Sequence, residues 1–167
     1  MSTLLEKQIK VNRIVTTSIE HARAIEDPAR AKIVEMLYHQ ALSADQITSV
    51  LKKVGYKKAL TTVRHHLEIL KNSGLIEIAK IEESRGAIKK YYGTSTKLLD
   101  FKTPEDFDSK YSKIIDKTST KIEKIIKGLT PKTTKSKGKQ SKEYSQYLVV
   151  EIINRAMTNV LENSEKK

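Results

Sequence analysis

The chain contains no cysteine among its 167 residues, which excludes disulfide bonds, thiolate metal sites and thiol redox switches. Glycine is scarce, at six residues, and no glycine-rich loop of the kind that cradles phosphates occurs. Serine, histidine and aspartate are present, but not in the arrangement that nucleophilic catalysis requires. We therefore expect the protein not to be an enzyme and to bind no cofactor.

Long apolar runs are also missing. No stretch of about 18 apolar residues occurs, so the chain is expected not to span a membrane. Its first residues lack the basic start, apolar run and cleavage site of a secretory signal. The predicted location is the cytoplasm, in association with the nucleoid.

Positive charge is concentrated in two stretches of the sequence. The formal net charge is +12. Residues 52–97 hold eleven basic and four acidic side chains, a net +7, and residues 131–142 hold five lysines and no acid, a net +5. The remainder of the chain is therefore neutral, which a merely lysine-rich composition would not produce. A local basic surface of this kind indicates a polyanionic partner, usually nucleic acid.

The first part of the chain is predicted to be helical. Helical spacing of apolar residues covers 4–26. A second helix occupies about 27–40, where Asp27-Pro28 supplies a cap and a suitable first residue. A third runs from the capping box of Ser43–Gln46 to Gly55, which ends it.

The next segment adds a helix and a hairpin. A helix is predicted over 58–72, with apolar residues along one face. Strand-like segments follow at 75–81 and 88–92, joined by a turn over 82–87. The predicted fold class is therefore mainly α with a small β-hairpin (α+β): a winged helix-turn-helix followed by C-terminal helices.

Four segments carry a family resemblance: DPARAKIVEML, LSADQI, TTVRHHLEILKNSGLI and RGAIKKYY. Together, over about residues 20–95, they resemble the winged-helix repressors of the arsenic-repressor (ArsR) type. The resemblance implies a dimeric transcriptional regulator, with the helix over 58–72 in the major groove of DNA and the wing, about 76–92, over the backbone or minor groove. Metal sensing is common in that family. This chain, however, has no cysteine and only four histidines, none of them in the helix over 104–129, so no metal site is expected.

The candidate DNA-binding residues lie on the helix over 58–72 and on the wing. Thr61 and Thr62 are short and polar, so the backbone can approach the bases. Arg64 can reach both acceptors of a guanine, and His65 can bond to a base edge or a phosphate. The other candidates are basic side chains expected to contact phosphates: Lys57, Lys58, Arg85, Lys89 and Lys90. Arg85, at the tip of the wing, can instead enter the minor groove.

Each candidate has an ordinary alternative. Thr61 and Thr62 can be plain helix surface, Arg64 a solvated charge or an intramolecular ion pair, and His65 an inert exposed imidazole. The lysines of the wing can serve only to protect a strand edge. His66, beside apolar neighbours, is expected on the inner side in a structural, hydrogen-bonded role.

Two further helices are predicted after the DNA-binding domain, which we place at 1–97. The first lies in residues 98–129, and its apolar positions follow a near-heptad seam from residue 104 that suits a dimer. A basic, flexible linker follows at 130–142. The segment 143–167 forms a C-terminal amphipathic helix, too apolar to remain in water. The expected dimerisation residues are Phe107, Tyr111, Ile114, Ile122, Ile125, Leu148, Ile152 and Ala156.

The leading hypothesis is a sequence-specific regulator that binds double-stranded DNA as a homodimer. Two alternatives remain open: an abundant, weakly specific DNA-coating protein of the nucleoid type, and a winged helix whose C-terminal helices bind another protein. Binding to duplex DNA separates the last from the other two. The sequence does not identify an effector; a signal would have to be a small molecule, a partner protein, a modification or the abundance of the protein itself.

Overall fold

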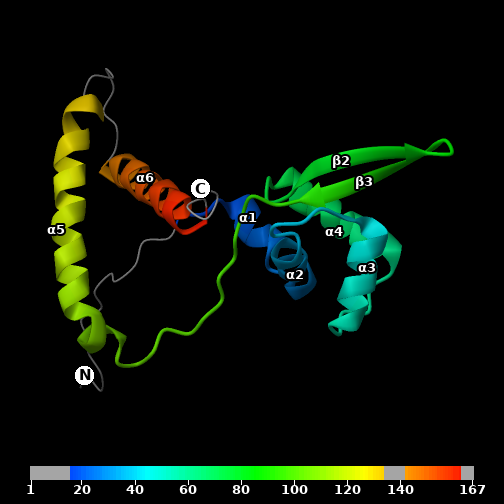
Figure 1. Cartoon of the computed structure of the whole chain (residues 1–167), viewed down its shortest axis with the longest axis horizontal. Coiled ribbons are helices and arrows are strands. Elements are labelled where there is room, and N and C mark those ends of the chain that lie inside the picture. Colours follow the sequence, from blue (N-terminus) through cyan, green and yellow to red (C-terminus); the bar gives the residue numbers. More distant parts are fainter. Residues whose placement is uncertain (1–15, 134–141, 163–167) are drawn as a thin grey trace, which may run out of the picture. The chain divides into compact units, whose positions relative to one another are not determined.

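The computed structural model describes residues 16–133 and 142–162 of the chain. It divides into two compact units, one of which is Thr17–Phe101; Lys102–Lys167 belong to the other. Figure 1 shows the elements of each unit. Within the described ranges, no helix combines the length and the apolar character needed to cross a membrane.

Four helices form most of the first unit: α1 (Ile19–Ala24), α2 (Pro28–Met36), α3 (Ala44–Lys53) and α4 (Leu60–Asn72). Of the helix predicted over 4–26, residues 1–15 lie outside the described residues; within 16–26 only Ile19–Ala24 are helical, because Ser18 caps the start of α1 and Ile25 its end.

The predicted starts of α2 and α3 are confirmed. The Asp27 side chain accepts a hydrogen bond from the Ala29 N–H and Pro28 is the first residue of α2. Ser43 and Gln46 form the reciprocal capping box of α3. The predicted end of α2 near residue 40 is wrong: the helix stops at Met36, and the following turn includes His39 at a φ of +64°.

A small antiparallel sheet completes the unit. Its strands are β1 (Leu42–Ser43), β2 (Glu77–Ser84) and β3 (Ala87–Gly93), in the order β1-β3-β2. The two-residue strand β1 was not predicted, because it is too short to show an alternating pattern. It pairs Ser43 with Tyr91, so the start of α3 is joined to the base of the hairpin.

The hairpin is longer than the sequence predicts. We expected a turn over 82–87, but the strands continue to Ser84 and Ala87, and the turn contains only Arg85 and Gly86. Both turn residues have positive φ, at +51° and +75°, as in the two-residue turns whose twist matches that of a hairpin. The longer strands carry the hairpin beyond the helices of the unit (Figure 1).

The core of the first unit lies where α2, α3 and α4 meet. The predicted inner face of α4 is confirmed, since Val63, Leu67 and Leu70 are buried. Burial of one such side chain contributes about 1.5–3 kcal/mol, so this cluster fixes the faces that α4 turns inward and outward. The core is completed by Ala24, Ile33, Val34, Leu37, Ile47, Leu51, Leu75 and Ile76.

The second unit contains α5 (Phe107–Thr133) and α6 (Lys142–Glu162). The predicted bounds of α5, 104–129, are wrong at both ends: the carbonyl of Pro104 accepts from the Phe107 N–H in a turn before the helix, and the helix continues through Thr133. Part of the predicted linker is therefore helical, and residues 134–141 lie outside the described residues.

Candidate nucleic-acid interface

The outer face of α4 carries the polar residues predicted to contact DNA. Thr61, Arg64 and His65 are exposed, and Thr62 is half-buried. The buried residues of the same helix point the other way, into the core. The helical period therefore displays the candidates together on the side of α4 that faces away from the core.

The chain enters α4 in a way that leaves its N-terminus without a side-chain cap. Gly55, at a φ of +96°, ends α3, and the Tyr56 N–H then bonds to the carbonyl of Leu51 at 2.8 Å. Ala59 is the N-cap of α4 and has no side chain that can accept a hydrogen bond. The helix begins at Leu60, two residues later than predicted. Its first N–H groups and the partial positive charge of the helix end are therefore available to an anion.

Two lysines stand at this helix end. Lys57 is exposed and Lys58 is half-buried, with its backbone N–H bonded to the Tyr56 carbonyl at 3.0 Å. Their charges add to the positive end of α4. This is the electrostatic arrangement that phosphate contacts require.

The wing presents its cations on both faces. Arg85 is exposed in the turn, and Lys89 and Lys90 are exposed on β3. Neighbouring residues of a strand point to opposite faces, so these two lysines do not share a face.

Sequence reasoning did not find the polar cluster around Tyr91, which consists of Lys80, Glu82, Lys89 and Tyr91. The Lys80 and Lys89 Nζ atoms lie 5.4 and 5.5 Å from the centre of the Tyr91 ring. Lys80 forms an ion pair with Glu82. The hydrogen bond from Lys80, and after it the hydrogen bond from Tyr91, lowers the pKa of the Glu82 carboxyl. The hydrogen bond to Glu82 in turn raises the pKa of Lys80. Only the strand register, which places Lys80 opposite Tyr91 and Glu82 opposite Lys89, would have revealed this cluster.

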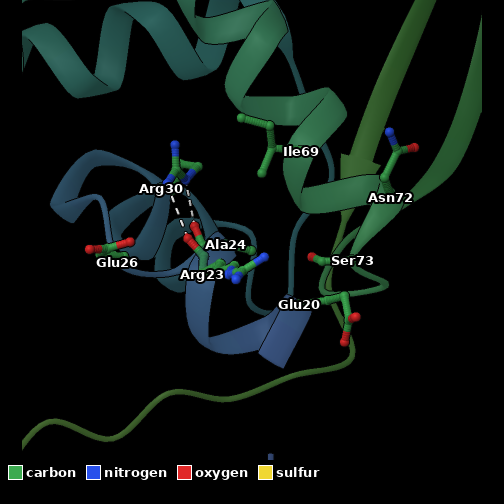
Figure 2. Close-up of a pocket in the computed structure, with 8 residues that line it drawn as sticks. All are labelled: Glu20, Arg23, Ala24, Glu26, Arg30, Ile69, Asn72 and Ser73. Carbon is green, nitrogen blue, oxygen red and sulfur yellow. Dashed lines mark hydrogen bonds between the residues drawn. The ribbon is translucent and has the colours of Figure 1, made fainter. Parts of the chain in front are cut away.

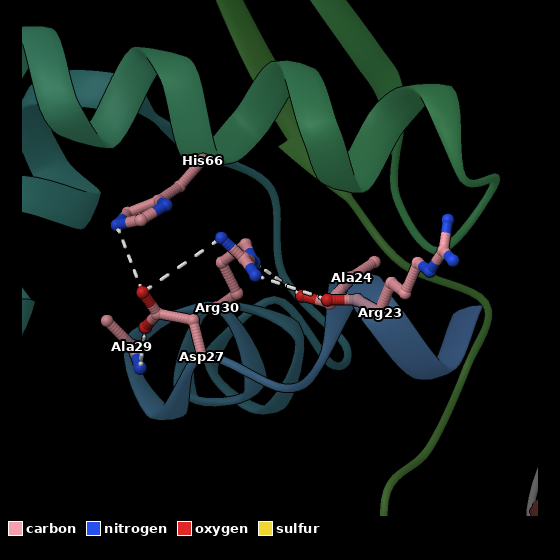
Figure 3. Close-up of polar contacts among 6 residues, drawn as sticks. All are labelled: Arg23, Ala24, Asp27, Ala29, Arg30 and His66. Carbon is pink, nitrogen blue, oxygen red and sulfur yellow. Dashed lines mark hydrogen bonds and ion pairs between the residues drawn. The ribbon is translucent and has the colours of Figure 1, made fainter. Parts of the chain in front are cut away.

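His66 lies on the inner side of α4, as predicted, and is only 5 % exposed. Its Nε2 is 3.9 Å from Oδ2 of Asp27, which belongs to the start of α2 (Figure 3). The predicted hydrogen bond is not found, since neither ring nitrogen has such a partner among the described residues. Burial lowers the pKa of His66; Asp27 opposes this effect, while Arg30, Lys58 and His65 reinforce it.

A hollow of about 570 Å³ lies where α1 and α2 meet the C-terminal end of α4 (Figure 2). Its lining contains two arginines and two glutamates, so the formal charges of the lining sum to zero. Arg30 is already engaged with the carbonyls of Ala24 and Arg23. The lining thus favours neither anions nor cations. It consists of Glu20, Arg23, Ala24, Glu26, Arg30, Ile69, Asn72 and Ser73.

Acidic and histidine side chains of the described residues form no group of three or more that could hold a metal ion.

The residues predicted to dimerise lie on α5 and α6, and none of them is buried. Ile114 is 62 % exposed and Ile125 is 47 % exposed. The rings of Phe107 and Tyr111 lie one turn apart, with their centres separated by 4.8 Å. Phe107, Ile152 and Ala156 are exposed, and Tyr111, Ile122 and Leu148 are half-buried.

Comparison with known proteins gives one family match. Residues 25–79 match the family model described as a helix-turn-helix domain. No curated protein matches the chain.

Comparison with solved structures finds proteins from three bacteria. HlyU from Vibrio cholerae is 20 % identical to this chain, with a TM-score of 0.36; the match covers 47 % of this chain and 74 % of the HlyU chain. The transcriptional regulator HlyU from Vibrio vulnificus is 17 % identical, with a TM-score of 0.33; the match covers 59 % of this chain and 83 % of the other. PadR from Bacillus subtilis, in complex with operator DNA, is 16 % identical, with a TM-score of 0.38; the match covers 84 % of this chain and 96 % of the PadR chain.

The family match ends in β2, and the hairpin of β2 and β3 follows α4 directly. Residues 25–79 are thus similar to a helix-turn-helix domain, and the helices α2, α3 and α4 followed by the hairpin have the element order of a winged helix-turn-helix.

Proposed function

We propose that this protein is a sequence-specific transcriptional regulator that binds double-stranded DNA as a homodimer and has no catalytic activity. The observation that carries the proposal is the outer face of α4. It displays Thr61, Arg64 and His65 beside an uncapped helix end and two lysines. Such a regulator acts on chromosomal DNA, so a cytoplasmic, nucleoid-associated location belongs to the proposal.

In this proposal α4 is the recognition helix and lies in the major groove. Arg64 bonds to the two acceptors of a guanine, and Thr61 and Thr62 allow the helix to approach the base edges. Lys57, Lys58 and the positive end of α4 hold phosphates and so fix the position of the helix.

The wing contacts the DNA backbone or the minor groove. Arg85 at its tip is the principal contact, and the two-residue turn holds this side chain at the end of a long, paired ribbon. Of Lys89 and Lys90, Lys90 lies on the face away from Tyr91 and is the better candidate, because Lys89 is already placed over the Tyr91 ring.

The test is selection of binding sites from a pool of random duplexes by the full chain, at about 0.15 M salt. A two-fold symmetric motif with half-sites about 34 Å apart, one turn of DNA, supports the proposal. Binding without enrichment of any sequence would favour a DNA-coating protein. No binding would contradict the proposal and favour a protein partner.

Two variants test the assignment of α4 to the groove. Arg64→Ala and Thr62→Ala should each relax the preference at one or two base pairs, by about 1–3 kcal/mol. Arg155→Ala on α6 is the matched control for Arg64→Ala, because it also removes one exposed arginine charge. An unchanged base preference in both α4 variants would show that α4 does not read the bases.

The homodimer is supported by the apolar side chains left unburied along α5 and α6. Apolar positions on α5 recur at Phe107, Tyr111 and Ile114 and again at Ile122 and Ile125, close to the spacing of a two-helix seam. Large exposed apolar patches mark interaction sites in soluble proteins.

Sedimentation of two α5 variants tests this part of the proposal. Ile114→Lys should shift the protein from dimer toward monomer, because the dimer interface would bury the lysine charge without a partner, which is energetically costly. Ser112→Lys adds the same charge at an exposed position on the same helix and should leave the dimer intact. A monomeric parent protein would contradict the homodimer, and equal behaviour of the two variants would remove Ile114 from the interface.

A further inference from the structure

The carboxylate of Asp27 connects two helices of the domain. Its Oδ1 accepts a hydrogen bond from the Ala29 N–H at 2.8 Å, which caps α2. Its Oδ2 lies 3.9 Å from Arg30 Nη1 and 3.9 Å from His66 Nε2 (Figure 3). Through these contacts the N-terminus of α2 faces the inner side of α4, the helix proposed to enter the major groove.

The surroundings of His66 contain more positive than negative charge. Arg30 comes from α2, Lys58 from the segment before α4, and His65 from α4 itself, while Asp27 provides the opposing carboxylate. That carboxylate is already shared with the Ala29 N–H and Arg30. Water hardly reaches the ring, because His66 is 5 % exposed. A neutral imidazole fits this site, whereas an imidazolium would be a buried cation with one shared counter-charge.

We propose that His66 is a positioning residue whose proton occupancy, together with Asp27, controls how firmly the recognition helix is held against α2, so that acidification weakens DNA binding. The inference rests on the proposed function. It adds a regulatory signal, the proton, that the sequence analysis did not identify.

The physical reason is solvation of the charged ring. A protonated His66 gains stability if α4 moves outward far enough for water to reach the imidazolium. Thr61, Thr62 and Arg64 lie on the same helix and move with it, so their approach to the bases is lost. Only molecules with neutral His66 then bind, and the apparent dissociation constant rises as the neutral fraction falls.

The first experiment follows the imidazole signals of the full chain by NMR from about pH 8 to pH 5, on both sides of the ordinary histidine pKa. His66→Gln identifies the His66 signal by its loss. We expect a His66 midpoint below the ordinary histidine value, and a lower midpoint still in Asp27→Asn. The asparagine retains the helix cap but not the charge that favours the imidazolium. A His66 midpoint at or above the ordinary value, or the same midpoint in both proteins, would overturn the inference.

The second experiment measures binding to a mixed-sequence duplex of about 40 base pairs, several times longer than one helical turn, over the same pH range. It uses His65→Gln as the parent, so that His66 is the only histidine on α4. The parent should lose affinity on acidification, approaching tenfold per pH unit below the His66 midpoint. The His65→Gln/His66→Gln variant should show no such loss; equal slopes would overturn the inference.

Two outcomes need a separate reading. If His66→Gln does not fold, Asp27→Asn in the His65→Gln parent replaces it, and its loss of affinity should begin at a lower pH. If no variant binds the duplex at any pH, the proposed function fails and the link to DNA fails with it. The NMR midpoints would still decide whether Asp27 and His66 interact.

Discussion

Removal of the Ser43 hydroxyl by Ser43→Ala should destabilise the winged helix-turn-helix domain. The hydroxyl accepts a hydrogen bond from the Gln46 N–H at 3.4 Å, and the Gln46 side chain accepts one from the Ser43 N–H at 2.9 Å. Alanine abolishes the first bond and leaves the Gln46 N–H without its cap. The second bond can remain, because it uses the backbone of residue 43.

The magnitude follows from the burial of the site. Loss of a helix N-cap typically costs about 1 kcal/mol and at most about 2 kcal/mol. Ser43 is 1 % exposed, so water cannot easily replace the lost bond, which favours the upper part of this range. The 3.4 Å length of the bond favours the lower part. We expect about 1–1.5 kcal/mol, equivalent to roughly 4–12 °C in Tm for a domain of this size.

Calorimetric unfolding of the full chain, with hydrogen exchange of the α3 amides, measures the effect. Ser49→Ala is the matched control: Ser49 is exposed on the same helix, and its hydroxyl donates to the Asp45 carbonyl at 3.0 Å without capping the helix. The control should change the free energy of unfolding by no more than about 0.5 kcal/mol. Equal effects of the two substitutions would refute the capping argument.

Three more predictions concern the core, the wing and the acid limb of stability. Leu67→Ala, at a side chain only 1 % exposed, should cost about 2–5 kcal/mol in urea unfolding; a loss below about 1 kcal/mol would contradict its place in the core. Arg85→Ala should reduce the slope of log affinity against log salt by about 1, measured over a series of salt concentrations; an unchanged slope would remove Arg85 from the DNA contacts. The pKa of Asp27 is affected first by burial, which raises it, but the Ala29 N–H and the charges of His66 and Arg30 lower it overall from 3.8. The stability that Asp27 provides is therefore complete above about pH 3.8 and is lost as the pH falls through the lower, folded-state pKa. Acid unfolding of Asp27→Asn should lack this part of the transition, and a transition identical to that of the parent would contradict it.

The elements with a local chemical signal could be predicted from the sequence. Asp27-Pro28, the Ser43 capping box and Gly55 are each recognisable from a few adjacent residues, and all three have the predicted role. The winged helix-turn-helix order followed from them. Errors occurred where long-range pairing decides the outcome: the hairpin strands extend through the charged residues Glu82 and Glu83 because β3 lies opposite, which no local pattern reports.

The candidate interface was predictable to a similar extent. The 3.6-residue period of α4 is enough to separate exposed Arg64 and His65 from buried His66. Contacts between distant segments were not predictable. The placement of Tyr91 opposite Lys80 depends on the register of β2 against β3, which shifts between Ile78 and Lys80, and the approach of Asp27 to His66 depends on how α2 packs on α4.

The strand order β1-β3-β2 leaves β2 at the edge of the sheet. An edge strand offers unpaired backbone groups to any other chain in an extended conformation, and this is a common start of aggregation. Here the strand is interrupted by an irregularity between Ile78 and Lys80, and it carries Lys80, Glu82 and Glu83 along its length. The charges that organise the wing therefore also protect it from self-association. A protein engineered to read DNA more tightly by replacing Glu82 and Glu83 with apolar residues would lose that protection.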